Sequence, residues 1–499
     1  MPTAKAARRP RADPAASRQL LSPSQLTGRY RALTLAMVMV LAVSAGIYLT
    51  FKTRAATVAY PLKLNANQRN LVDQNGQPVF MDIDTAWTFL SAIPDRAEAD
   101  AYLDARKAQG FNTVMSFATG FRSKNATKAG IPAFINGDRG KPNDAYFATV
   151  DQLVQDAGAR GMQVLLGPVN LSSNGTDDPD GLPTLAQWQA LGTYLGNRYK
   201  NFDNIIWLMG GNHDVQQTWA DTTDYTPYID AMANAIKAAD PRHLMTYYPA
   251  VDTYVLAAKP WLDFYAFQEN RADSSPYSYM RVKGYYEYAP VKPVIDLEPG
   301  YETGDALTGA TTTPYMVRRN AWWAFLQGAL GVTYGGNRAT WAIDNDGTAF
   351  KWRPYIGLGG DKQTGLMAAV VAGYNWQNLT PDSTHQVVTT GYGTYGSRDF
   401  VTAGFSPDGN LAMVYLPISR TIAVNMAKFS APVQGYWYDP STGTVSTIGT
   451  GFVNGGTKTF ATPGNNAAGQ SDWLLVLTTG QSGAGPAPAG TVTPRRGVF

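Results

Sequence analysis

Eight short apolar runs alternate with amphipathic stretches, and this alternation constrains the fold of the 499-residue chain more than any other feature. The pattern is typical of parallel strands joined by crossover helices. Runs such as VLLG and IIWLM are continuously apolar, and VIDL is apolar except for Asp296, as expected where both faces of a strand are buried. Eight repeats over about 300 residues favour a (β/α)8 TIM barrel over an open sheet. The expected strands are Val79–Asp82, Thr113–Phe117, Gln163–Gly167, Ile205–Met209, Leu244–Tyr247, Asp263–Phe267, Val294–Leu297 and Val332–Tyr334.

Helices are expected between these strands, and the pattern changes after the last repeat. The expected helices are Arg96–Gln109, Ala145–Arg160, Leu185–Lys200, Tyr228–Ala239 and Tyr315–Gln327. From Asp382 to about Thr479, short alternating strands are broken by turns such as Pro407-Asp408-Gly409. The sequence therefore predicts an α/β barrel over residues 60–380 and a small all-β sandwich domain over residues 382–479. Residues 480–499 are rich in Gly, Pro and Ala, and we expect them to be disordered.

The N-terminal region predicts export. Ala32 to Phe51 contains no charged residue, and a helix of this length spans about 30 Å, the thickness of a bilayer core. The basic residues 1–31 are expected to stay cytoplasmic, which places the body outside a cell membrane that it spans once. The alternative is a secreted protein whose signal peptide is cleaved near the small residues Thr57-Val58-Ala59.

Charge and composition exclude several function classes. Residues 1–54 hold nine basic groups against Asp13, a charge of +8; since the whole chain carries +3, the remainder carries −5. A mildly acidic body offers no electrostatic surface for nucleic acid. No Gly-x-Gly-x-x-Gly turn or Walker loop opens a helix, which argues against a nucleotide. The chain has no cysteine and three scattered histidines, so we expect no metal site and no cofactor.

Polar residues follow several of the expected strands, where the active site of a barrel lies. Two carboxylates at such a mouth, one protonated and one ionised, are what hydrolysis of a glycosidic bond requires. For Asp84, capping of the next helix explains the position equally well. For Glu298 a functional role is favoured, because Pro299 prevents a regular continuation of the strand. The candidate residues are Asp84, Trp87, Asn212, His213, Asp214, Glu298, Tyr301, Glu302, Arg338 and Trp341.

Several segments, taken together and in order, resemble the apiosidase-like glycoside hydrolases. The resemblance spans roughly Tyr60 to Thr479. It rests on Leu71–Pro78 leading into Asp84–Trp87, on Asn204–Gly211, on Pro293–Glu302, on Arg319–Trp323 through Gly331–Gly335, and on the Tyr438–Gly443 turn. It implies a (β/α)8 barrel followed by a small β domain named for collagen binding.

The resemblance also implies roles for individual residues. Glu298 matches the nucleophile of a retaining glycosidase, and the second catalytic acid of the family directly follows the Gly-Gly of the fourth strand. Here Asn212 occupies that position, and Asp214 comes two residues later. Either Asp214 has taken over as proton donor, or the activity differs or is impaired. The expected function is retaining hydrolysis in a polysaccharide or its side chains, with the remaining candidates contacting the sugar. The alternative is a carbohydrate-binding or adhesion protein that has lost its acid.

Overall fold

The computed structural model describes residues 58–92, 96–119, 130–171, 183–216, 223–269, 277–303, 311–337, 340 and 352–480. The basic segment 1–31, the expected membrane helix 32–51 and the tail from residue 481 lie outside these ranges. Within them, no helix combines the length and the apolar character that crossing a bilayer demands.

All eight expected strands are present, each displaced by at most a few residues. They follow a small antiparallel sheet of β1 (Lys63–Leu64), β2 (Leu71–Val72) and β3 (Pro78–Val79). The eight strands are β4 (Met81–Thr85), β5 (Thr113–Thr119), β6 (Gln163–Val169), β7 (Ile205–Gly210), β8 (Met245–Tyr248), β9 (Tyr265–Gln268), β10 (Val294–Glu298) and β11 (Gly331–Tyr334).

These strands form a TIM-barrel-like arrangement. Six of them make a parallel sheet in the order β11-β4-β5-β6-β7-β8, and β9 pairs with β10 in parallel. The two sheets are linked at both edges, because Leu330 N–H donates to Val294 O (2.9 Å) and Asp263 N–H donates to Met245 O (2.8 Å). Apolar side chains fill the interior, and a second apolar layer lies between strands and helices. Parallel strands of this kind bring all their carboxyl ends to one mouth.

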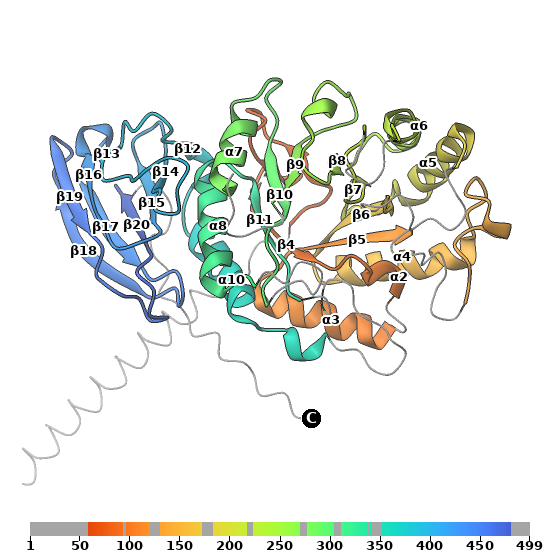
Figure 1. Ribbon diagram of the computed structural model, residues 1–499, viewed down its shortest axis with the longest axis horizontal. Helices are drawn as coiled ribbons and strands as arrows, with labels where there is room; N and C mark the ends of the chain where they lie inside the picture. The colour runs from red at the N-terminus through yellow and green to blue at the C-terminus, as the bar shows by residue number, and fades with distance from the viewer. Residues whose placement is uncertain are drawn as a thin grey trace, which may run out of the picture. The chain divides into compact units, whose positions relative to one another are not determined.

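Helices cover the outside of the strands (Figure 1). Thr184 and Thr313 begin α5 and α8 with capping boxes that satisfy their first N–H groups. Glycines allow α5 and α6 to pack closely, since a Cβ at Gly192 would lie 2.5 Å from Met232 O. The helices are α2 (Phe89–Ala92), α3 (Arg96–Gln109), α4 (Asp144–Ala159), α5 (Leu185–Tyr199), α6 (Thr226–Ala239), α7 (Ser278–Tyr286), α8 (Pro314–Leu326) and α10 (Gly359–Ala372).

A β-rich domain follows α10. One antiparallel sheet has the order β12-β14-β15-β20-β17-β18, and a second has the order β13-β16-β19. Alternate side chains of both sheets, such as Val414, Leu475, Val424 and Phe460, form a common apolar core. The strands are β12 (Thr380–Pro381), β13 (Val388–Thr390), β14 (Thr402–Phe405), β15 (Leu411–Leu416), β16 (Thr421–Asn425), β17 (Val433–Tyr438), β18 (Val445–Phe452), β19 (Thr457–Ala461) and β20 (Trp473–Thr478).

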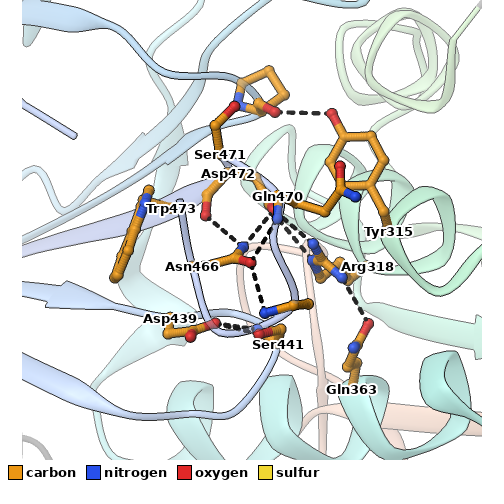
Figure 2. A network of polar contacts seen from close by, with 12 residues as sticks. Tyr315, Arg318, Gln363, Asp439, Ser441, Asn466, Gln470, Ser471, Asp472 and Trp473 are labelled. Carbon is orange, nitrogen blue, oxygen red and sulfur yellow. Dashed lines mark hydrogen bonds and ion pairs between the residues drawn. The ribbon is translucent and has the colours of Figure 1, made fainter. Parts of the chain in front are cut away.

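A buried ion pair joins this domain to α8 (Figure 2). The Arg318 guanidinium donates to both carboxylate oxygens of Asp472, at 2.7 and 2.6 Å. Asp472 also accepts from Tyr415 Oη (2.8 Å) and Asn466 Nδ2 (2.7 Å). Because Asp472 is fully buried, these donors replace the water that its charge would otherwise require. The β-rich domain is therefore held in a fixed geometry against the helix that lies behind β10 and β11.

Candidate active site

Glu298 is the last residue of β10, and its buried carboxylate lies at the mouth of the strands. The register of β10 against β9 shifts between Asp296 and Glu298, so Glu298 pairs with Gln268. The Glu298 carboxylate accepts a hydrogen bond from Gln268 Nε2, which also donates to Tyr248 Oη at 2.9 Å. An amide donor from the neighbouring strand thus fixes the orientation of the carboxylate.

Aromatic side chains adjoin this carboxylate. Trp87 Nε1 donates to Tyr301 Oη at 2.7 Å, and the Trp87 ring lies 4.6 Å from that of Tyr248. Trp87 also stacks on Phe117, with ring centroids 5.7 Å apart. The structure therefore brings three of the predicted residues, Glu298, Trp87 and Tyr301, into one connected group. Because Trp87 and Tyr248 are only 3% and 2% exposed, these rings pack in the core beside the strand ends and support the carboxylate.

Two members of this group were missed by the sequence analysis, Tyr248 and Gln268. Each is the last residue of its strand, β8 or β9, and so occupies the position in its strand that Glu298 occupies in β10. The signal was present, because Gln268 is a polar residue directly after an apolar run.

Asp214 lies at the same mouth, next to the loop that follows β8. Its Oδ1 accepts from Val251 N–H at 2.9 Å. The carbonyl of Val251 in turn accepts from the backbone N–H of Gln268 (3.2 Å). Burial raises the pKa of the Asp214 carboxyl, while hydrogen bonds from the loop backbone partly oppose this increase. Asp214 is thus connected to Gln268, and through it to Glu298, by one loop residue, Val251.

The turn between β7 and Asp214 has an unusual backbone. Gly210 and Gly211 adopt φ of 83° and 139°, and Asn212 follows with φ of 51°. A Cβ at Gly211 would lie 2.7 Å from Asn170 Cα, so only glycine fits there. Asn212 is half-buried at the position where the resemblance implies an acid.

The burial of the His213 side chain corrects the prediction that this residue contacts the sugar. The His213 side chain is 0% exposed and packs edge-on against Tyr225, with ring centroids 4.6 Å apart. Its backbone carbonyl accepts from Tyr247 Oη at 2.6 Å. His213 therefore anchors the turn in the core behind the mouth.

Asp84 does not reach the mouth either, contrary to the expectation that it lines a sugar subsite. It lies within β4, and its side chain points outward to α3. There it forms an ion pair with Arg106 (Oδ1 to Nη2, 2.9 Å) and accepts from Tyr102 Oη (2.5 Å). Burial raises the pKa of Asp84 to about 6, although Arg106 lowers it. Asp84 therefore caps no helix and instead links β4 to α3.

The structure also corrects the prediction that Glu302 contacts the sugar. Its carboxylate accepts from Gly360 N–H (2.9 Å) and from Tyr334 Oη (2.7 Å), and it is 2% exposed. Gly360 lies in the first turn of α10, where unpaired N–H groups favour a carboxylate. Glu302 thus fixes the start of α10 instead of facing a sugar.

The two remaining candidates, Arg338 and Trp341, lie outside the described residues. Over the described ranges, no three His, Asp or Glu side chains are arranged to hold a metal ion.

Comparisons with known proteins identify the family and the order of the domains. Residues 65–378 match the family model described as "Apiosidase-like, catalytic domain", and residues 387–478 match the "Putative collagen-binding domain of a collagenase". Among curated proteins, none matches the chain.

Two solved structures have a similar fold. One, titled "Glycoside hydrolase", is 24% identical, with a TM-score of 0.73 over 84% of this chain and 97% of the other. A glycoside hydrolase family 5 protein from Bacteroides vulgatus is also 24% identical, with a TM-score of 0.72 over 84% of this chain and 93% of the other. At this identity the likeness concerns the fold.

Proposed function

Since the chain belongs to the apiosidase-like glycoside hydrolases, and is thus a glycosidase, we propose that it cleaves its glycosidic bond with retention of configuration. Glu298 is the proposed nucleophile, and the substrate is a polysaccharide or its side chains. The observation that carries this proposal is the Glu298 carboxylate, held by Gln268 at the end of β10 beside Trp87 and Tyr301.

The chemistry follows from this arrangement. A carboxylate at the strand end attacks the anomeric carbon while a proton is delivered to the leaving oxygen, and water then hydrolyses the glycosyl-enzyme. Holding the carboxylate in one orientation lowers the entropic part of the barrier.

The proposed proton donor is Asp214. Its raised pKa favours the protonated form that a general acid needs, and the loop after β8 connects it to the Gln268 side of the mouth.

The alternative is that Asn212 marks a lost acid and the protein binds carbohydrate without turnover. Incubation of the purified protein with a glycan panel, with NMR detection of the first-formed anomer, tests both. A retained anomer supports the proposal; an inverted anomer contradicts retention; binding without any product supports the alternative.

Replacing Asp214 with Asn is expected to separate substrates by leaving group. Activated aryl glycosides need little protonation and should keep turnover within about tenfold, whereas sugar leaving groups should lose roughly 10²–10⁴-fold. The measurement is kcat against leaving-group pKa. Asp252→Asn, on the loop that Asp214 contacts, is the control and should keep the wild-type dependence. Equal turnover of both substrate classes by Asp214→Asn would exclude Asp214 as the acid.

We also propose that residues 32–51 anchor the protein with its body outside the cell membrane. The proposal is supported by the absence of charge in this segment and by the basic residues before it. The full-length protein is expected in the membrane fraction with an intact N-terminus, as checked by fractionation and N-terminal sequencing. A soluble form beginning near Tyr60 would instead indicate signal cleavage.

A further inference from the structure

Two buried carboxyl groups lie side by side behind the mouth. Asp296 is two residues before Glu298 on β10, and Glu269 directly follows β9. Each residue is 7% exposed, and each carboxyl shifts the pKa of the other. Two ionised carboxylates this close together and this deeply buried would repel each other, so the arrangement favours one proton shared by the pair.

The Asp296 carboxyl and the backbone N–H of Glu269 hold the backbone of Glu298 from both sides. Glu298 N–H donates to Asp296 Oδ1 at 3.1 Å, and Glu269 N–H donates to the Glu298 carbonyl at 3.1 Å. The strand register shifts between Asp296 and Glu298. Irregularities of this kind change the direction of the side chain that follows. The pair thus lies where β10 departs from regular pairing and directs Glu298 toward Gln268.

The charged and polar groups around the pair come from the two helices packed on β9 and β10. Arg281 on α7 donates to Gln268 O at 3.0 Å, and on α8 Asn320 Nδ2 contacts Glu269 Oε2 at 3.5 Å, next to Arg319. Burial is the main cause that raises the pKa of both carboxyls. Asp296 raises the pKa of Glu269 further, while Arg319 and Arg281 lower it. The pair therefore keeps a proton at pH values where an exposed carboxyl has lost it.

We propose that Glu269 and Asp296 are positioning residues for Glu298. The proton that they share keeps Asp296 where it holds the Glu298 backbone, and loss of this proton at alkaline pH displaces Glu298 and lowers turnover. The inference rests on the proposed role of Glu298. A displacement of about 1 Å at a reacting group is enough to lower turnover about 100-fold.

Asp296→Asn tests the shared proton. The amide Oδ1 still accepts from Glu298 N–H, and Nδ2–H donates to an ionised Glu269, so the contact survives without a titrating proton. The expected result is a kcat within about threefold of wild type near neutral pH, an unchanged KM, and an alkaline decline shifted up by at least about one pH unit. The substrate is the dinitrophenyl glycoside that the wild type cleaves fastest, because its leaving group makes the rate independent of a proton from Asp214.

Asp296→Ala tests the contact itself. It removes the acceptor for Glu298 N–H, so kcat should fall about 100-fold at every pH while KM changes little. Glu302→Gln is the matched control, since it removes a buried carboxyl near α10 and should leave the alkaline decline in place. An alkaline decline unchanged in Asp296→Asn, or wild-type kcat in folded Asp296→Ala, would overturn the proposal.

A second readout does not depend on catalysis. Because the folded-state pKa values are raised, protonation of the pair stabilises the fold at low pH, and this stability is lost as pH rises through those values. The wild-type melting temperature should therefore decrease toward alkaline pH more steeply than that of Asp296→Asn. Equal slopes would contradict the shared proton even if Glu298 proves not to be the nucleophile, so the two proposals fail separately.

Discussion

Glu298→Gln is expected to abolish hydrolysis while leaving the fold intact. The amide can still accept from Gln268 Nε2, so the melting temperature should stay within a few degrees of wild type. It cannot attack the anomeric carbon, and we expect kcat to fall by roughly 10³–10⁵-fold, about 4–7 kcal/mol of lost transition-state stabilisation. Turnover of aryl glycosides, thermal unfolding and saccharide binding are the three measurements, and binding should persist.

The nucleophilic role is separated from a merely electrostatic one by chemical rescue. In Glu298→Ala, azide should restore turnover and give a glycosyl azide whose configuration is opposite to that of the substrate, because the small anion attacks from the side that the carboxylate occupied. Glu302→Gln, a carboxyl four residues away that contacts α10, should change stability and not kcat. Wild-type turnover by folded Glu298→Gln would remove Glu298 from the mechanism.

Arg106→Met is expected to cause the largest loss of stability. Arg106 is fully buried and forms ion pairs with Asp84 (2.9 Å) and Asp361 (2.8 Å). Removing the cation from these two buried carboxylates costs about 3–5 kcal/mol at neutral pH, because their remaining hydrogen bonds, from Tyr102 Oη and Gly357 N–H, do not neutralise the charge. Arg96→Met, at the other end of α3, is the control: the Arg96 side chain is 62% exposed and Gln152 Nε2 still donates to Asp156, so the unfolding midpoint should stay close to wild type.

The loss should also depend on pH. Burial raises the pKa of Asp84 to about 6 and raises that of Asp361. Because the folded-state pKa values of both carboxyls are raised, their protonation stabilises the fold at low pH, and this contribution is lost as they ionise. The loss of stability in Arg106→Met should therefore be small near pH 4 and reach its full size near pH 8. Urea unfolding at both pH values measures this difference. A defect of equal size at both would show that packing, and not charge, is the role of Arg106.

The local pattern of the sequence determined the eight strands of the barrel and identified Glu298 as a candidate. Continuous apolar runs placed all eight strands within a few residues, and α3 begins and ends where it was predicted. Glu298 could be singled out because a charged residue at the end of such a run, followed by proline, has few structural explanations. The change from helical to alternating periodicity near Asp382 likewise predicted the β-rich region.

The tertiary structure decided which way the polar residues point. Strand β4 continues to Thr85, so Asp84 lies inside it and shares its outward face with Asp82. A strand that is buried on both sides lacks the alternation of apolar and polar residues that would distinguish the barrel interior from the helix side. The sequence therefore could not show on which of the two sides Asp84 lies. Glu302 was misplaced for a related reason, because its partner α10 begins with Gly359-Gly360 and gives no helix signal.

Long-range pairing decided the rest of the site. Gln268 and Tyr248 belong to it only because β8, β9 and β10 end side by side. The connection between Asp214 and Gln268 likewise depends on one residue, Val251, of the loop after β8. The ion pair of Arg318 with Asp472 joins residues 154 positions apart. Local periodicity reports which residues are buried, whereas contacts between distant segments depend on register and packing that no short window of sequence contains.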